Sequence, residues 1–102
     1  KKSKKDKNDL KVWSSKILQE INSNINYPVL ALQNQISGKV IIQLSITNKG
    51  ILKKLSLIQS SGFDILDNEV LRAVSNSDHY PSAPLSLSKK QYSFKLPIKF
   101  EI

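Results

Sequence analysis

Strict alternation of apolar and polar residues marks the carboxyl end of the chain. The even-numbered positions there are apolar, whereas the odd-numbered ones carry Ser93, Lys95, Pro97, Lys99 and Glu101; the apolar set is Tyr92, Phe94, Leu96, Ile98, Phe100 and Ile102. This period of two predicts a β-strand with one buried face and one exposed face. Because Pro97 has no N–H to donate, the pattern favours an edge strand whose odd-numbered backbone groups point outward.

An outward edge of this kind has two possible uses. Charged side chains such as Lys95 and Lys99 protect an exposed edge from aggregation, and the same unpaired backbone groups are able to bind another extended segment. Considered without any relative, the residues favour the protective use.

Helical spacing of apolar residues dominates the amino-terminal third. From Asp9, a suitable N-cap, the stripe comprises Leu10, Trp13, Ile17, Leu18, Ile21 and Ile25. Trp13 is interpreted as a packing anchor. The cluster at residues 24–26 and the Tyr27-Pro28 pair end this helix, because the residue before proline disfavours the α region. Residues 29–36 predict a short second helix or turn.

A hairpin follows at residues 39–59. Residues 39–47 alternate and are rich in β-branched side chains, residues 48–50 form a short loop, and residues 51–59 return as the partner strand. Ile41 interrupts the polar face, which predicts that the first helix covers part of that face. Lys53 and Lys54 are consecutive, which predicts a bulge or a strand that begins properly at Leu55.

Residues 64–77 predict a further helix, with the stripe Leu66, Val70, Ala73 and Val74. Asp64, Asp67 and Glu69 are expected in its first turn, where they stabilise the helix terminus and would repel a phosphate. Residues 78–90 form a loop before the last strand. A strand–helix–strand crossover joins parallel strands, so the strand order is 2-1-3 with the last strand at an edge. The predicted class is α+β: a three-stranded antiparallel sheet with helices packed on one face, plus an amino-terminal helix.

Composition limits the domain organisation. The 102 residues suit one domain, contain no cysteine and carry a net charge of +8. Residues 1–8 are expected to be the disordered, Lys-rich end of a linker, and residues 9–102 a single domain. The Lys-rich start, which has no signal-peptide pattern, is interpreted as part of a longer protein.

Catalytic chemistry finds little support in the sequence. His79 is the only histidine, and no nucleophile motif, metal-ligand cluster or pair of carboxylates is present, so no catalytic residue, cofactor or metal site is predicted. A nucleic-acid-binding module is the competing hypothesis, since the chain is basic and Tyr92, Phe94 and Phe100 share one strand. Those aromatic residues alternate with Leu96 and Ile98, which favours a core, and no nucleic-acid partner is predicted. A steep salt dependence of single-strand binding would favour the alternative.

An ordered set of short motifs resembles the C-terminal domain of TonB energy transducers. The set spans residues 27–102 and comprises Tyr27-Pro28, Ala31, Gly38-x-Val40, Ile46 through Gly50, Ser60-Ser61-Gly62, Leu66-Asp67, Ala73-Val74, Pro81-x-x-Pro84 and Leu96-Pro97-Ile98-x-Phe100. A TolA-like periplasmic interaction domain is the alternative within the binding class. The Tyr27-Pro28 pair and the ending at residues 96–100 favour TonB.

The resemblance implies a periplasmic domain of an inner-membrane-anchored protein, which takes part in uptake of iron and siderophores. It implies two partners: the TonB box of outer-membrane transporters, bound by strand addition to the last strand, and an ExbB/ExbD-type complex, contacted through a region outside this chain. The expected partner-binding residues are Tyr92, Ser93, Phe94, Lys95, Leu96, Pro97, Ile98 and Lys99, together with Asn24, Ile25, Asn26 and Tyr27. Pairing is expected to be strongest near residues 93–95 and interrupted at Pro97. The exposed edge also predicts a concentration-dependent homodimer.

Overall fold

The computed structural model describes the backbone of residues 4–77 and 79–102, which form three helices and one sheet. In chain order the elements are α1 (Lys4–Asn24), α2 (Val29–Gln33), β1 (Gly38–Thr47), β2 (Leu52–Gln59), α3 (Asp64–Ser75) and β3 (Gln91–Phe100). The sheet order is β2-β1-β3, and both pairings are antiparallel. The predicted α+β class and strand order are therefore confirmed.

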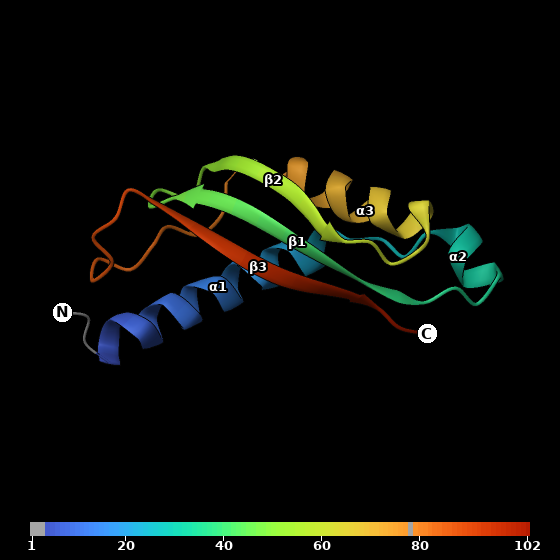
Figure 1. Ribbon diagram of the computed structural model, residues 1–102, viewed down its shortest axis with the longest axis horizontal. Coiled ribbons are helices and arrows are strands. Elements are labelled where there is room, and N and C mark those ends of the chain that lie inside the picture. The colour runs from blue at the N-terminus through green and yellow to red at the C-terminus, as the bar shows by residue number, and fades with distance from the viewer. Residues whose placement is uncertain (1–3, 78) are drawn as a thin grey trace.

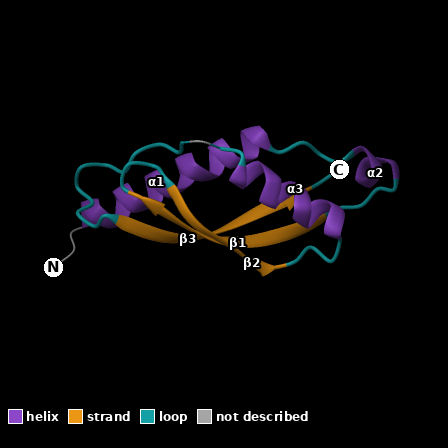
Figure 2. Cartoon of the chain, turned by 90° about the horizontal axis from the view of Figure 1, so that it is seen from above, coloured by secondary structure: helices purple, strands orange, loops and turns teal. Residues whose placement is uncertain are grey.

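The three helices lie on one side of the sheet and leave the other side open (Figure 2). Figure 1 looks onto the open side, with α1 behind β3 and α2 at the end of the molecule near the carboxyl terminus. The covered side holds the core, in which Val40, Ile42, Leu44 and Ile46 of β1 are fully buried. Ile41 points to the open side and is half-buried there without a helix over it, so the prediction that the first helix covers it is wrong.

α1 packs on the sheet through Trp13, Ile17 and Ile21, which are buried and lie one helical turn apart. The Trp13 ring meets Tyr92 and Phe94 edge-on, with centroid separations of 5.6 and 5.1 Å. Its Nε1 donates to the Pro81 carbonyl oxygen at 2.7 Å. The prediction of Trp13 as a packing anchor is confirmed.

The start of α1 differs from the prediction. The helix begins at Lys4, not at Asp9, so residues 4–8 are helical where a disordered linker was expected; residues 1–3 lie outside the described part. Asp9 is not an N-cap. Its carboxylate accepts a hydrogen bond from the Ser86 hydroxyl at 2.5 Å, which ties the helix to the loop before β3.

β2 contains two irregularities. Ile46 pairs with Leu52 while Ser45 pairs with Lys54, so Lys53 is an extra residue, and Ile58 is a second one between the partners of Ile42 and Ile41. These are β-bulges, which bend and twist a strand. The predicted bulge near Lys53 is thus confirmed, whereas the strand begins at Leu52 and not at Leu55.

The predicted burial stripe of α3 is confirmed, but its first turn differs. Phe63 is the N-cap residue and no side chain caps the helix; only Asp64 and Asp67 lie in the first turn. Asp67 accepts hydrogen bonds from the Ser60 and Ser61 hydroxyls and from the Ser61 amide at 2.9 Å. The serines therefore join the end of β2 to α3 through Asp67 and do not cap the helix.

Gly50 holds the loop after α3 against the β1–β2 hairpin. It has φ +88°, and a Cβ at this position would lie 2.0 Å from the Tyr80 carbonyl oxygen. The close approach allows the Tyr80 amide to donate to the Gly50 carbonyl at 2.8 Å. Only glycine fits both the backbone conformation and the contact.

Candidate strand-addition edge

The outer edge of β3 presents backbone groups that no other strand of the described chain pairs. β3 is the last strand of the sheet, and its ten residues pair with β1 in an uninterrupted register from Gly38–Phe100 to Thr47–Gln91. No bulge interrupts this register, so β3 is a regular strand along its whole length.

Two hydrogen bonds fix which groups face outward. The Thr47 amide donates to the Ile51 carbonyl at 2.9 Å, so odd-numbered residues of β1 face β2. The Asn48 amide donates to the Lys90 carbonyl at 2.8 Å, so even-numbered residues on the β3 side face β1. Alternate backbone groups point to opposite sides of a strand. The odd-numbered groups of β3 therefore point outward, as predicted from Pro97.

The side chains of β3 divide in the same way between the two faces. Ser93, Lys95, Pro97 and Lys99 are exposed on the open face, whereas Phe94, Leu96 and Ile98 are buried and Tyr92 is half-buried. Leu96 and Ile98 can therefore contribute to strand addition only by supporting the edge from below. The burial of Phe94 and Phe100 likewise confirms the core interpretation and removes the stacking surface that the nucleic-acid hypothesis needs.

α1 lies on the covered side of the sheet, behind β3 (Figure 1). Leu10 and Leu18 are half-buried on this helix. Both leucines pack against the core cluster that includes Phe94 and Leu96. A strand paired with β3 would thus have its covered face on the side of the sheet where α1 lies.

The second predicted region, residues 24–27, lies near the carboxyl end of β3. The Tyr27 ring meets Phe100 edge-on at 5.3 Å, and its hydroxyl donates to the Ile36 carbonyl. The Asn26 amide donates to Glu69 at 2.7 Å, and Arg72 Nη2 donates to the Asn24 carbonyl at 2.9 Å.

All four of these residues thus make contacts inside the domain. Asn24 and Asn26 contact α3, and Tyr27 contacts β3 and the segment after α2, while the half-buried Ile25 packs against the core cluster. The segment is held in place at the end of the open edge. Its role in partner binding stays a prediction.

Glu69 is the centre of this attachment, and the sequence did not single it out for that role. It accepts from Arg72 Nε at 2.9 Å and forms an ion pair with Arg72 Nη2 at 2.6 Å. The hydrogen bond from Arg72, opposed by burial and helped by the Asn26 amide, lowers the pKa of Glu69 below its ordinary value. The carboxylate therefore stays ionised and holds residues 24–26 against α3.

A metal site would require several titratable residues of the described part to lie close together. His79 is exposed, and no group of three or more His, Cys, Asp or Glu residues is placed to bind a metal there. None of the described helices combines the length and hydropathy that crossing a membrane requires.

Residues 23–102 match the family model of the Gram-negative bacterial TonB protein C-terminal. This chain belongs to that family. A TonB protein of Neisseria meningitidis serogroup C is 30% identical over 76 residues, which cover 74% of this chain and 25% of that protein. A TonB protein of Pasteurella multocida is 27% identical over 94 residues, or 92% of this chain and 36% of that protein. The chain thus spans about a quarter to a third of the length of these relatives.

Solved structures of the family share the fold. The TonB C-terminal domain of Helicobacter pylori superposes with a TM-score of 0.73 at 26% identity, covering 88% of this chain and 80% of that one. The C-terminal domain of HasB superposes with a TM-score of 0.58 at 25% identity, covering 88% and 70%. The sheet with its outer third strand is therefore the architecture of TonB C-terminal domains.

Proposed function

We propose that this domain binds an extended segment, the TonB box of outer-membrane transporters, by adding it as a fourth strand beside β3. The observation that carries the proposal is the regular, ten-residue β3 whose odd-numbered backbone groups point away from the sheet. Backbone pairing at a sheet edge gives affinity that depends little on the sequence of the added segment. One domain can therefore serve several transporters.

The surroundings of β3 support this role. The strand rests on a buried apolar row, so adding a partner does not require the edge to reorganise. Pro97 has no N–H to offer, so the proposed ladder is strongest at Ser93 and Lys95 and interrupted near Pro97. Residues 24–27 lie at the end of β3 that carries Phe100, where the added segment would leave the edge.

Membership of the TonB family extends the proposal to the whole protein. In it, the domain lies in the periplasm, the region outside this chain anchors it in the inner membrane, and an ExbB/ExbD-type complex supplies the energy of the proton gradient. The domain transmits that energy to the transporter and catalyses no reaction. Uptake of iron and siderophores is the transport process we assign to it.

The proposal is tested by titrating TonB-box peptides into the labelled domain and following amide chemical shifts. Shifts that cluster on residues 92–99 are expected. Ser93→Pro removes one outward N–H and should weaken binding about tenfold or more. Leu57→Pro removes an outward N–H from β2 instead and should leave binding unchanged, with circular dichroism confirming that both variants fold. An absence of shifts with several boxes, or shifts confined to α1, would reject strand addition to β3.

A further inference from the structure

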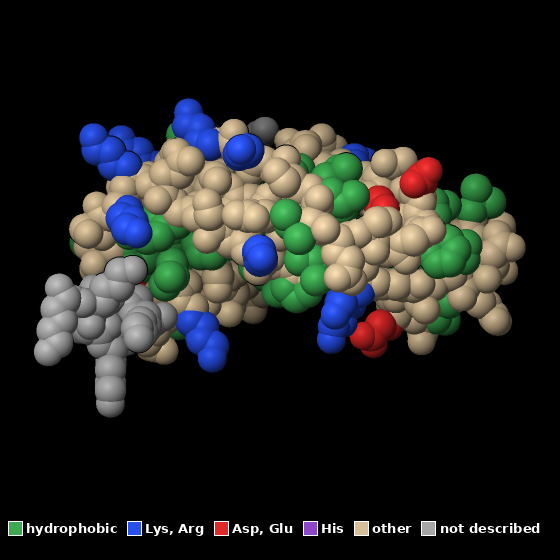
Figure 3. Space-filling model, in the orientation of Figure 1, with side chains coloured by type: hydrophobic (Ala, Val, Ile, Leu, Met, Phe, Trp, Pro, Cys, Tyr) green, Lys and Arg blue, Asp and Glu red, His purple; other side chains and the backbone are tan. Residues whose placement is uncertain are grey.

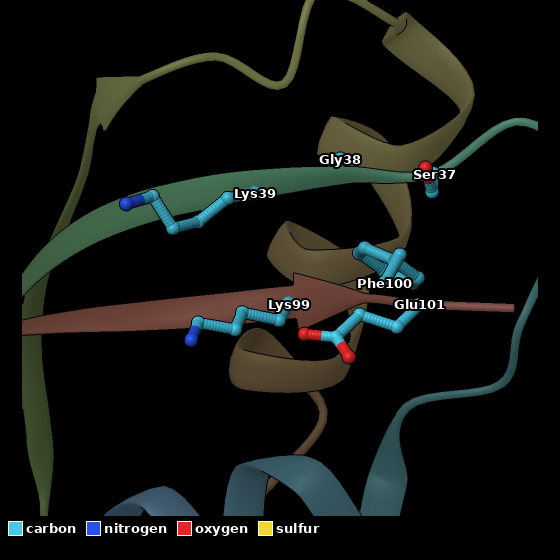
Figure 4. Close-up of a pocket in the computed structure, with 6 residues that line it drawn as sticks. All are labelled: Ser37, Gly38, Lys39, Lys99, Phe100 and Glu101. Carbon is cyan, nitrogen blue, oxygen red and sulfur yellow. The ribbon is translucent and has the colours of Figure 1, made fainter.

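Lysines line the open face of the sheet next to the outer edge of β3. Residues of β1 and β3 that pair in register point to the same face, and Lys39 pairs with Lys99 while Gln43 pairs with Lys95. All three lysines are exposed. Figure 4 shows Lys39 and Lys99 side by side, both extending away from the strand ends.

This arrangement places like charges directly opposite each other, which destabilises a sheet. Among the described side chains, the only ion pair within 4.0 Å is that of Arg72 with Glu69, so none of the three lysines forms such a pair. Glu101 shares with Lys39 and Lys99 a shallow hollow of about 340 Å³ but lies beyond the end of β3. Three lysines therefore lie beside the edge without a close ion pair to another described side chain, and Glu101 is the acid that shares the hollow with two of them.

A strand added to β3 would bring its own side chains to this charge. Alternate residues of the added strand point to the open face and lie beside Ser93, Lys95, Pro97 and Lys99. The others point to the covered face, on the side of the sheet where α1 lies. Lys95 and Lys99 are four residues apart, which is about 14 Å along a strand, and Pro97 lies between them.

We infer that β3 selects a segment with carboxylates at two open-face positions four residues apart, opposite Lys95 and Lys99, and with apolar side chains at the alternating positions. This inference rests on the proposed strand addition and names the chemistry of the segment that is added. Lys39 lies one strand further from the edge, about 10 Å from the added backbone, and its long side chain reaches the carboxylate beside Lys99. The acid opposite Lys99 therefore meets two cations and contributes more than the acid opposite Lys95.

The test uses short synthetic peptides with valine at alternate positions. One peptide carries two glutamates four residues apart on the other face, a second carries glutamines there, and a third carries glutamates two residues apart, so that only one faces a lysine while the other faces Pro97. At low salt the first peptide should bind about threefold to tenfold more tightly than the second, with the third between them. The difference should shrink as salt is raised.

Variants assign the effect to named side chains. Lys39→Gln and Lys99→Gln should each reduce the preference for the glutamate peptide, and Lys99→Glu should reverse it in favour of a lysine peptide. Lys49 is an exposed lysine in the hairpin loop, away from the edge of β3. Lys49→Gln removes one positive charge there and should leave the preference unchanged.

The outcomes separate this inference from the function beneath it. Equal affinity for the glutamate and glutamine peptides, or an equal effect of Lys49→Gln, overturns the inference and leaves strand addition intact. Failure of all peptides to shift residues 92–99 overturns strand addition itself, and the inference falls with it.

Discussion

The two edges of the sheet belong to the same three-stranded structure, yet they differ in almost every respect. β2 contains two bulges in eight residues, whereas β3 pairs with β1 over ten residues without one. The covered side of β3 is buried, with Ile98 only 1% exposed, whereas Leu57 of β2 is 40% exposed. Bulges and a poorly covered face make β2 a weak template for another strand, since a partner could not pair with it in register.

The comparison shows that an edge is made available by what lies beneath it as much as by what it leaves unpaired. β3 packs through Tyr92 and Phe94 on Trp13 and through Phe100 on Tyr27, so it is supported along its length. β2 has less support: it pairs with β1, but Leu52 and Leu55 are only half-buried and Leu57 is exposed, and its end is held by the bonds from Ser60 and Ser61 to Asp67. A regular edge strand with a buried face suits the addition of another strand. A bulged edge strand with a partly exposed face protects the sheet from aggregation.

The largest expected effect on stability comes from removing a buried side chain of β3. Phe94→Ala deletes a buried ring that packs on Trp13 with a centroid separation of 5.1 Å, and it should lower the free energy of unfolding by about 3–5 kcal/mol. Leu57→Ala, on the covered side of β2, should cost about 1 kcal/mol because the side chain is 40% exposed. Urea unfolding followed by Trp13 fluorescence measures both. Equal losses would contradict the difference between the two edges.

A smaller effect is expected at the anchor of β2. Asp67→Asn weakens the hydrogen bonds from Ser60 and Ser61 and should lower the free energy of unfolding by about 1.5–3 kcal/mol. Asp64→Asn, an exposed acid in the same helical turn, is the matched control and should cost less than about 1 kcal/mol. Amide exchange should accelerate at residues 59–61 in Asp67→Asn while β3 stays protected. Faster exchange in β3 instead would show that the two edges open together.

Low pH should weaken the same attachment of β2 to α3. Burial raises the pKa of Asp67, but the hydrogen bonds from Ser60 and Ser61 outweigh it and lower the pKa below its ordinary value of 3.8. The pKa of Glu69 is likewise held below its ordinary value of 4.5, chiefly by the hydrogen bond from Arg72.

A carboxylate with a lowered pKa in the folded state stabilises the fold fully above its ordinary pKa, and the stabilisation is lost as pH falls through the folded-state value. Unfolding free energy should therefore be constant above about pH 5.5 with respect to these groups and decline as pH falls through 4.5 and 3.8 and below. Urea titrations across this range measure the decline. Asp67→Asn should flatten part of it, and a variant curve as steep as the wild type would assign the acid sensitivity elsewhere.

The smallest effect concerns the one missing donor on β3. Pro97→Ala restores an outward N–H and should strengthen peptide binding about twofold to tenfold, the value of one net hydrogen bond. It should also increase self-association through the edge, measured by sedimentation at rising protein concentration. Pro84→Ala, in the preceding loop, is the matched control: it increases the conformational entropy of the unfolded chain in a similar way but leaves the edge of β3 unchanged. An equal response from both variants would mean that Pro97 does not limit pairing.

The sheet could be predicted because two independent features agree on it. The crossover helix between β2 and β3 makes these two strands parallel to each other, so both flank β1. Pro97 independently predicts that β3 is an edge strand with its odd-numbered backbone groups outward. Alternation along β1 and β3 then identified the apolar residues of the covered face, of which only Tyr92 is half-buried. On the open face Ser45 is buried and Ile41, Gln43 and Thr47 are half-buried, which alternation did not predict. Local patterns are reliable where packing is regular.

The remaining features depend on contacts between distant residues. Residues 4–8 carry no apolar stripe, so periodicity gave no sign that α1 continues through them; extending an existing helix needs no new nucleus, and lysine is a good helix former. The attachment of residues 24–26 by Glu69 and the alignment of Lys39 with Lys99 follow only from the packing of α3 and the register of β1 with β3. Neither is encoded in local spacing.

The uninterrupted register of β3 also determines how a strand beside it would respond to tension. The strands run along the long dimension of the molecule (Figure 1), and in an antiparallel pair the hydrogen bonds lie across the strand direction. A pull along the strand therefore loads every bond of the added segment at once, whereas a sideways pull peels them one by one. The face in Figure 3 extends along that same direction, with lysines standing out at several places. A strand added to β3 would therefore resist a lengthwise load more than a sideways one without any conformational change in the domain.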